Sequence, residues 1–370
     1  MGAMKPEYAA QPKGAQLNRS QFDLTETHKT TFDASELAPF YWTWAYPGEV
    51  FKGRVQAFLR MSSPLDFPIM DNLKVTAHWY FTPCRILWTN FRKFFGEKDN
   101  PGDSTTYTLP TLTGSTNCAT KTAFTELATK LNIPMQTVDF TDVGAMPFRA
   151  YNKIYNWHYR DQNLTNSLTE NVDDGPDGQG DYGIEQRAKR HDYFTSNLPA
   201  PQRGEAISIG GEIATDVSSG GWPSVYGTSP AAYRRLDSDG TNVDLSTTSG
   251  SEANVLYPNT TINELRNAVA IQRFLEADNR YGTRFDEVIY AHYGTEFNDV
   301  RIAPVFLGGG SGYISTSAIP NQGDLVTGNL GDLAAVATGG LDGASFTYAV
   351  DEPGIIMGII MVSSDIAYRS

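Results

Sequence analysis

Apolar and polar residues alternate along several stretches of the chain, and this alternation predicts a fold built mainly of β-strands. Val55, Ala57 and Leu59 fall on one face of such a strand, and residues 74–83 are dense in β-branched and aromatic types. Residues 62–72, between the two, contain two prolines that would interrupt a central strand, so we expect a loop there.

A continuous apolar run indicates a buried strand near the end of the sequence. Residues 354–369 read GIIMGIIMVSSDIAYR, an unbroken apolar stretch followed by alternation. Residues 205–258 have a different character, because they are rich in Gly, Ser, Thr and Asp and show little periodicity. They predict a long excursion from the core.

The clearest helix is predicted over residues 261–282. Thr261 and Glu264 have the spacing of a capping box, in which each side chain bonds the backbone N–H of the other, and Gly282 provides a stop. The periodicity predicts a buried stripe formed by Ile262, Leu265 and Val269 with Phe274 or Leu275.

Three shorter helices are predicted between strand-like segments. One spans residues 122–131, and one begins at Pro147, since proline is tolerated at the first helical position. A third follows Pro83 and stops at Gly96. Its apolar face would consist of Leu87, Trp88, Phe91, Phe94 and Phe95.

Composition supports a β protein with long loops and many contacts. Glycine and proline supply 34 and 20 residues and are spread along the chain, as in loop-rich β proteins. Aromatic residues make up 12% of the sequence, and they are enriched at protein interfaces. The net charge of −13 argues against binding nucleic acid over the whole surface, so only a local basic face could touch it.

No catalytic, cofactor or metal site is predicted, which argues against an enzyme. The scattered histidines lack metal-ligand spacing, and the glycine run at residues 307–312 lacks the Gly-Lys-Ser/Thr of a phosphate loop, so we expect a flexible loop there. Asp173 and Asp174 lie among turn-forming residues, where structural calcium is conceivable although the EF-hand pattern is absent. The histidines expected to be structural are His28, His78, His158, His191 and His292.

Three further features concern the cell compartment. Cys84 and Cys118 cannot form a disulfide framework, so we expect two buried free thiols in a reducing environment. Residues 1–27 lack the apolar core of a signal peptide and predict a flexible arm. No stretch has the roughly 20 apolar residues of a membrane span, which predicts no membrane insertion.

The most basic segment covers residues 185–194. Its cations lie beside aromatic rings, a combination that suits single-stranded DNA because phosphates bind cations and bases stack on rings. The same charges also suit ion pairs between subunits or exposure to solvent. We favour this second interpretation over contact with DNA. The candidate DNA-facing residues are Arg187, Lys189, Arg190, Tyr193 and Phe194.

Six colinear segments resemble the major capsid proteins of the Microviridae, and in detail those of the gokushovirus branch. They include PLDFPIMDNLKVTAHWYFTPCRILWTNF and the helix TINELRNAVAIQRFLEADNRYG with the residues that follow it. The matching segments are residues 28–41, 64–91, 96–105, 156–164, 189–204 and 261–294.

The resemblance implies a viral jelly roll, two antiparallel sheets facing each other with large loop insertions, in one domain over residues 28–370. It implies a structural subunit of a small T=1 icosahedral phage capsid, assembled in the host cytoplasm. Residues 205–258 resemble an insertion that projects at the three-fold axes, which makes them a candidate for host-receptor binding. Trp88, Phe91 and Phe94 are candidate contacts between subunits.

The resemblance also implies partners. These are identical subunits, the packaged circular single-stranded DNA, a small basic DNA-packaging protein, a DNA pilot protein and an internal scaffolding protein. Family members usually continue beyond the segment that ends here at Ser370, so we expect either a truncated or a shortened relative.

Two other classes of protein remain open at this point. Jelly rolls with exposed aromatic residues also bind or cleave carbohydrates, and glycan binding by a monomer would favour that reading. A single-stranded-DNA-binding module is disfavoured by the acidic charge, and tight, strongly salt-dependent binding by isolated subunits would support it.

Overall fold

The fold was examined in a computed structural model of the chain. It describes residues 20–61, 69, 71–104, 106–113, 120–134, 142–207, 224–226, 233–238, 243–246, 261–296, 302–320, 331 and 333–365. Cys118 and most of the predicted 62–72 loop lie outside the described residues. Residues 20–27, the described part of the predicted arm, are exposed and have no regular secondary structure.

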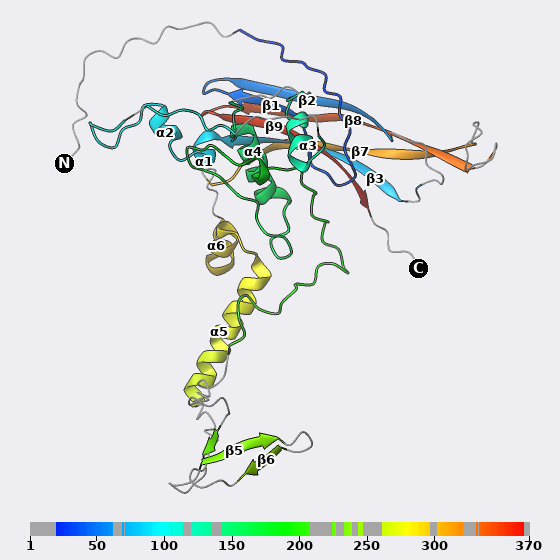
Figure 1. The fold of residues 1–370 in the computed structure, drawn as a ribbon. Coiled ribbons are helices and arrows are strands. Elements are labelled where there is room, and N and C mark those ends of the chain that lie inside the picture. Colours follow the sequence, from blue (N-terminus) through cyan, green and yellow to red (C-terminus); the bar gives the residue numbers. More distant parts are fainter. Residues whose placement is uncertain are drawn as a thin grey trace.

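The main body is a six-stranded antiparallel sheet, which confirms the prediction of a mainly β fold. Its two central strands are β3 and β7, and β1 and β2 form its edges (Figure 1). In sheet order the strands are β1 (Ala38–Ala45), β9 (Gly354–Asp365), β3 (Asn72–Pro83), β7 (Val305–Pro320), β8 (Leu333–Ala349) and β2 (Val50–Arg60).

The sheet curls so that its two halves enclose an apolar core. Val75 and Ala77 of β3 belong to one buried cluster with Leu341 and Ala344 of β8, although β7 lies between these strands in the sheet. The indole N–H of Trp79 donates across this core to the carbonyl oxygen of Ala344 at 3.2 Å. The curled sheet is consistent with a capsid β-sandwich, and the two separate facing sheets of a jelly roll stay a prediction.

The glycine run at residues 307–312 is part of strand β7, so the predicted flexible loop is wrong. A Cβ on Gly310 would lie 3.0 Å from the Cα of Ala344, and a Cβ on Gly312 would lie 2.2 Å from the carbonyl oxygen of Gly340. Both neighbours belong to β8, which crosses β7 here at close range. Glycine is therefore required for close backbone approach within a strand, not for mobility.

The convex face of β3 and β9 is covered by helices. Tyr80, Met357 and Ile359 on this face join one buried cluster with residues of α1 (Cys84–Leu87) and α4 (Met146–Ile154). On the concave face of β9, Ile356 and Ile360 are also buried. Burial on both faces explains why residues 354–361 form a continuous apolar run, and it confirms the strand predicted from that run.

Two of the three short helices match their predictions. Helix α3 (Ala123–Lys130) begins after the N-cap Thr122, and α4 carries Pro147 in its first turn and continues as a π-helix at Tyr155–Tyr159. A single 3₁₀ turn follows at Gln179–Asp181.

The helix predicted after Pro83 is instead two separate turns, α1 and α2 (Phe91–Phe94). The chain is extended at Trp88, with φ −148° and ψ 119°. The Trp88 indole N–H donates to the Asp174 carboxylate at 2.6 Å, a partner far away in the sequence. This tertiary contact overrides the local helical periodicity.

Helix α5 (Ile262–Tyr281) has the predicted capping box between Thr261 and Glu264, and it ends at Gly282. Its predicted burial is wrong, because Ile262 is 71% exposed and Leu265 and Val269 are exposed as well. Figure 1 gives the reason: α5 extends away from the main sheet, so nothing described lies against most of this stripe.

At the near end of α5, α6 (Phe285–Tyr293) packs back on it. A three-stranded sheet lies beyond the far end (Figure 1), formed by β4 (Ser224–Tyr226), β5 (Tyr233–Ser238) and β6 (Val243–Ser246). Among the helices of the described residues, none is long and apolar enough to cross a membrane.

We predict that Gly312→Ala destabilises the subunit, whereas Gly102→Ala does not. The new methyl group at position 312 would meet the β8 backbone, which cannot move aside as a flexible side chain can, while nothing lies within 4 Å of a Cβ at Gly102. Overpacking of this kind costs about 1–3 kcal/mol. Urea unfolding followed by tryptophan fluorescence measures the difference, and equal stability of the two variants would refute the close-approach explanation.

Candidate interaction surfaces

Two partly buried histidines of the folded body have structural partners. Within the described residues, no group of three or more His, Cys, Asp or Glu side chains could hold a metal ion. His78 Nδ1 lies 2.8 Å from the Tyr159 hydroxyl, and burial lowers the pKa of His78 to about 4. His158 Nε2 lies 3.0 Å from the Pro304 carbonyl oxygen, and burial lowers its pKa as well. Both rings are neutral structural groups at pH 7.

The Asp-rich loop around residue 174 is fixed by a buried ion pair. Arg149 donates from Nε to Asp177 Oδ2 at 2.7 Å and from Nη1 to the Leu87 carbonyl oxygen at 3.1 Å. Both side chains of the Arg149–Asp177 pair are 1% exposed. Asp174 accepts hydrogen bonds from Trp88 and Asn90, so its carboxylate is engaged in holding the loop to the α1–α2 turn.

The structure corrects two of the three candidate subunit contacts. Trp88 is 0% exposed and Phe91 is buried, because both pack inside the chain against α4 and its neighbours. Their side chains therefore belong to the core. Phe94 is 37% exposed and stays a candidate, and its neighbour Phe95 is 61% exposed.

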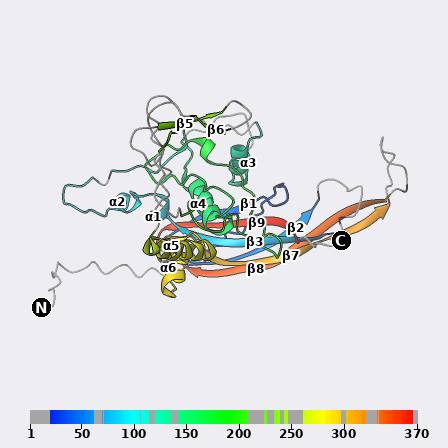
Figure 2. The ribbon, with the colours of Figure 1, turned by 90° about the horizontal axis from the view of Figure 1, so that it is seen from below.

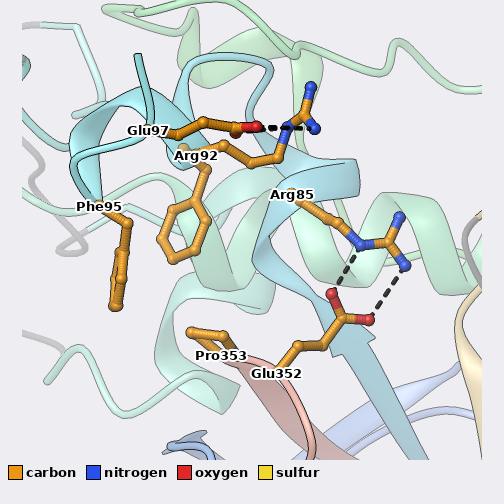
Figure 3. Close-up of a pocket in the computed structure, with 7 residues that line it drawn as sticks. Arg85, Arg92, Phe95, Glu97, Glu352 and Pro353 are labelled. Carbon is orange, nitrogen blue, oxygen red and sulfur yellow. Dashed lines mark hydrogen bonds and ion pairs between the residues drawn. The ribbon is translucent and has the colours of Figure 1, made fainter. Parts of the chain in front are cut away.

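A surface notch of about 300 Å³ lies beside these rings (Figure 3). Its charged walls are paired with each other: Arg85 Nε lies 2.6 Å from Glu352 Oε2, and Arg92 Nε lies 3.2 Å from Glu97 Oε2. The rest of the lining is Phe91, Phe95 and Pro353. With its charges mutually neutralised, the notch has the character of a contact surface and not that of a catalytic site.

The basic segment, residues 185–194, divides into an inner and an outer part. The Arg187 guanidinium lies over the Tyr159 ring, 5.8 Å from its centroid, so this candidate is turned toward the helix-covered side of the molecule. Lys189 pairs with Asp192 at 2.7 Å. Arg190, Tyr193 and Phe194 are exposed. The structure does not gather all five candidates into one face, and their role as DNA contacts stays a prediction.

A second surface lies on the outward face of β2. Lys52, Arg54, Phe58 and Arg60 are all exposed there. The signal was present in the sequence, because the alternation that places Val55, Ala57 and Leu59 inside also places these residues outside. A role for this face could not be predicted from the sequence of β2 alone, since the partner strands that complete it come from residues 305–349.

Comparison with known proteins relates this chain to phage capsid proteins. The capsid protein (F protein) family model matches residues 10–370. Capsid protein VP1 of Bdellovibrio phage phiMH2K is 31% identical, over 97% of this chain and 72% of the relative. Capsid protein VP1 of Chlamydia phage 1 is 28% identical, over 99% and 74%. Capsid protein VP1 of Spiroplasma virus 4 is 28% identical, over 85% of this chain and 63% of the relative.

We predict that Arg149→Met lowers the free energy of unfolding by about 3–5 kcal/mol, because it leaves the Asp177 carboxylate buried without its counter-charge. Arg92→Met is the matched control, since the Arg92–Glu97 pair is solvent-exposed and contributes little. Chemical denaturation of both variants gives the comparison. Similar small losses in the two variants would mean that the buried pair does not fix the loop.

Proposed function

This chain belongs to the phage capsid protein (F protein) family, and on that premise we propose that it forms the T=1 icosahedral shell of a small phage resembling the Microviridae. It is a structural subunit of the virion and not an enzyme, and it assembles with other subunits into a shell. The carbohydrate-binding alternative finds no support among these relatives. The observation that carries the proposal is the family match over residues 10–370.

The proposed function is geometric, because repeated weak contacts close a container. Interfaces of roughly 800 Å² per partner suffice when many act together. The subunit offers suitable material, since Phe94 and Phe95 and the apolar stripe of α5 are exposed outside the core. Exposed apolar surface of this extent is expected on a protein that buries it against other subunits.

We propose that α5 and the small sheet β4–β5–β6 form the projection at the three-fold axes. Figure 1 supports this assignment, since α5 carries the small sheet far from the main sheet. Ile262, Leu265 and Val269 would then contact symmetry-related copies of the same helix. Strands β4, β5 and β6 lie beyond the far end of α5, and the segment that contains them, residues 205–258, would be the part that meets a host receptor.

The proposed partners inside the shell are circular single-stranded DNA, a small basic DNA-packaging protein, a DNA pilot protein and an internal scaffolding protein, with assembly in the host cytoplasm. The net charge of −13 supports a basic partner, because an acidic shell alone does not neutralise phosphate. Within the basic segment 185–194, Asp192 pairs with Lys189 in the same chain, which offsets one of the cations that could meet the genome.

Electron microscopy of the protein purified from its native source tests the shell directly. We expect uniform icosahedral particles of T=1 size, with α5 density on their outer surface at the three-fold axes. A monodisperse monomer, with binding to a glycan panel, would contradict the proposal. Particles with α5 on the inner surface would retain the shell but exclude the receptor role of residues 205–258.

A pair of variants tests the role of the α5 stripe. Leu265→Asp places a charge in the proposed contact between copies, so we expect particles of lower melting temperature or yield. Asn267→Asp adds the same charge at another exposed position of α5 and should leave particles unchanged. Circular dichroism of the subunits checks that the helix is retained in both. Equally stable particles from the two variants would show that the stripe is not an interface.

A further inference from the structure

The convex face of β2, β8 and β7 carries a row of side chains that the shell function leaves unexplained. Phe58 pairs with Gly340 of β8, and Ile314 of β7 pairs with Gly339, so Tyr313 is the neighbour of Gly340 on its other side. Tyr313 pairs in turn with Lys74 of β3. The four residues therefore lie in one row across four strands.

The two rings of this row are open to solvent. Phe58 is 78% exposed and Tyr313 is 71% exposed. Gly340 between them has no side chain, so only backbone lies between the two rings. Neighbouring strands are about 4.8 Å apart, which puts the two Cα atoms roughly 10 Å from each other. Each ring can then offer a flat face to a separate base.

The charge of this face contrasts with that of the whole chain. Strands β2, β7 and β8 contain three basic residues, Lys52, Arg54 and Arg60, and one acidic residue, Asp342. Asp342 accepts from Arg54 at 2.7 Å, so Lys52 and Arg60 stand without an acidic side chain on these strands to oppose them. The chain as a whole has a net charge of −13. A local excess of cations on an acidic protein favours a polyanionic ligand.

The β2 edge of the sheet lies on the side of the body away from α5 (Figure 1). Helices α1 and α4 cover the convex face of β3 and β9, whereas β8 and β2 close the opposite side of the curled core. Figure 2 shows α4 on one side of β9 and β3, and β8 on the other. In Figure 1, α5 leaves the body on the side opposite β2. If α5 projects outward from the shell, the β2–β8–β7 face looks inward.

We propose that this face binds single-stranded DNA, with bases stacked on Phe58 and Tyr313 and phosphates held by Lys52, Arg60 and Lys74. The inference rests on the proposed function, because it takes the inner face of the shell as its setting. Exposed aromatic rings beside cations on a sheet bind single strands without sequence preference, since every base has a face to stack. A base-paired duplex offers no such free faces.

The basic segment 185–194 is the competing genome contact. Its cation Arg187 is directed at Tyr159 on the helix-covered side, and its Lys189 is paired with Asp192. The β2–β8–β7 face combines rings and cations on one rigid surface. The two surfaces therefore make separable predictions.

The test measures binding of a fluorescent oligo-dT to the dissociated full-length subunit by anisotropy over a salt series. We expect Phe58→Leu with Tyr313→Leu to weaken binding at least tenfold, because leucine keeps apolar bulk but offers no ring to stack. Lys52→Gln with Arg60→Gln should make the slope of log K against log salt shallower by about 1.4, at about 0.7 for each lost phosphate contact. Both rings are surface residues, so melting temperatures should be unchanged.

The matched control is Tyr193→Leu with Phe194→Leu, which removes two exposed rings from the basic segment. We expect this variant to bind oligo-dT as the unaltered chain does. Loss of binding in the control but not in the Phe58, Tyr313 variant would overturn the inference in favour of the segment. Unchanged binding in both ring variants would also overturn it.

Particle assembly separates this inference from the proposed function. We expect the Phe58, Tyr313 variant to form shells of normal size whose packaged DNA is reduced or less protected from nuclease. Normal shells with normal DNA content would refute the proposed DNA-binding face, but they would be consistent with the proposed capsid function. Failure of the variant to assemble, with unchanged oligo-dT binding, would show that the face is a contact between copies. Failure of the unaltered chain to form shells would contradict the proposed function itself.

Discussion

The close approach of β8 to the glycines of β7 is the constraint on which the rest of the subunit depends. Because Gly310 and Gly312 have no Cβ, the β8 backbone can cross β7 at contact distance, and the sheet can curl there. The curl brings Ala344 of β8 to the Trp79 indole of β3, and the concave face closes into a dry core. A flatter sheet would leave that apolar face exposed to water. The free-energy cost would be about 25 cal/mol for each Å² of apolar surface that stays exposed.

The same curl gives the subunit two different outer sides. On one side, the convex surface of β3 and β9 is buried under α1 and α4, and the Arg149–Asp177 pair fixes the loops above it. On the other side, β2 and β8 have no helix over them within the part of the chain that the structure describes, and their outward residues stay exposed. Such asymmetry suits a subunit of a shell, because the inner and outer surfaces of a shell have different surroundings.

Local patterns in the sequence predicted the elements whose formation depends on local physics. The capping box at Thr261 and Glu264 predicted the start of α5, and the apolar run after residue 354 predicted β9, because each signal lies within the element itself. Errors arose where a distant partner decides the outcome. The glycines of β7 look like a loop unless β8 is known to cross them, and Trp88 leaves the predicted helix because Asp174 binds it.

The prediction that the apolar stripe of α5 is buried was wrong for a related reason, and this reason bears on function. Periodicity shows that a helix has an apolar face, but it does not tell whether the partner lies in the same chain. In an isolated enzyme, the stripe of Ile262, Leu265 and Val269 would be a defect, whereas in a shell it has other copies to meet. The exposed apolar stripe and the exposed rings of Phe58 and Tyr313 are therefore best understood at the level of the assembly.

Electrostatics sets a limit on how that assembly can close. Identical subunits that each carry a charge of −13 repel one another, and the proposed packaged DNA would add further negative charge. Apolar contacts between copies can offset the repulsion between subunits, but they cannot neutralise the negative charge of DNA phosphates. Cations must therefore be concentrated where the genome lies, either on a basic partner or on the wall itself. On the proposed DNA-binding face, Lys52 and Arg60 would provide part of that charge without making the outer surface basic, so attraction for DNA would be confined to one side of the shell.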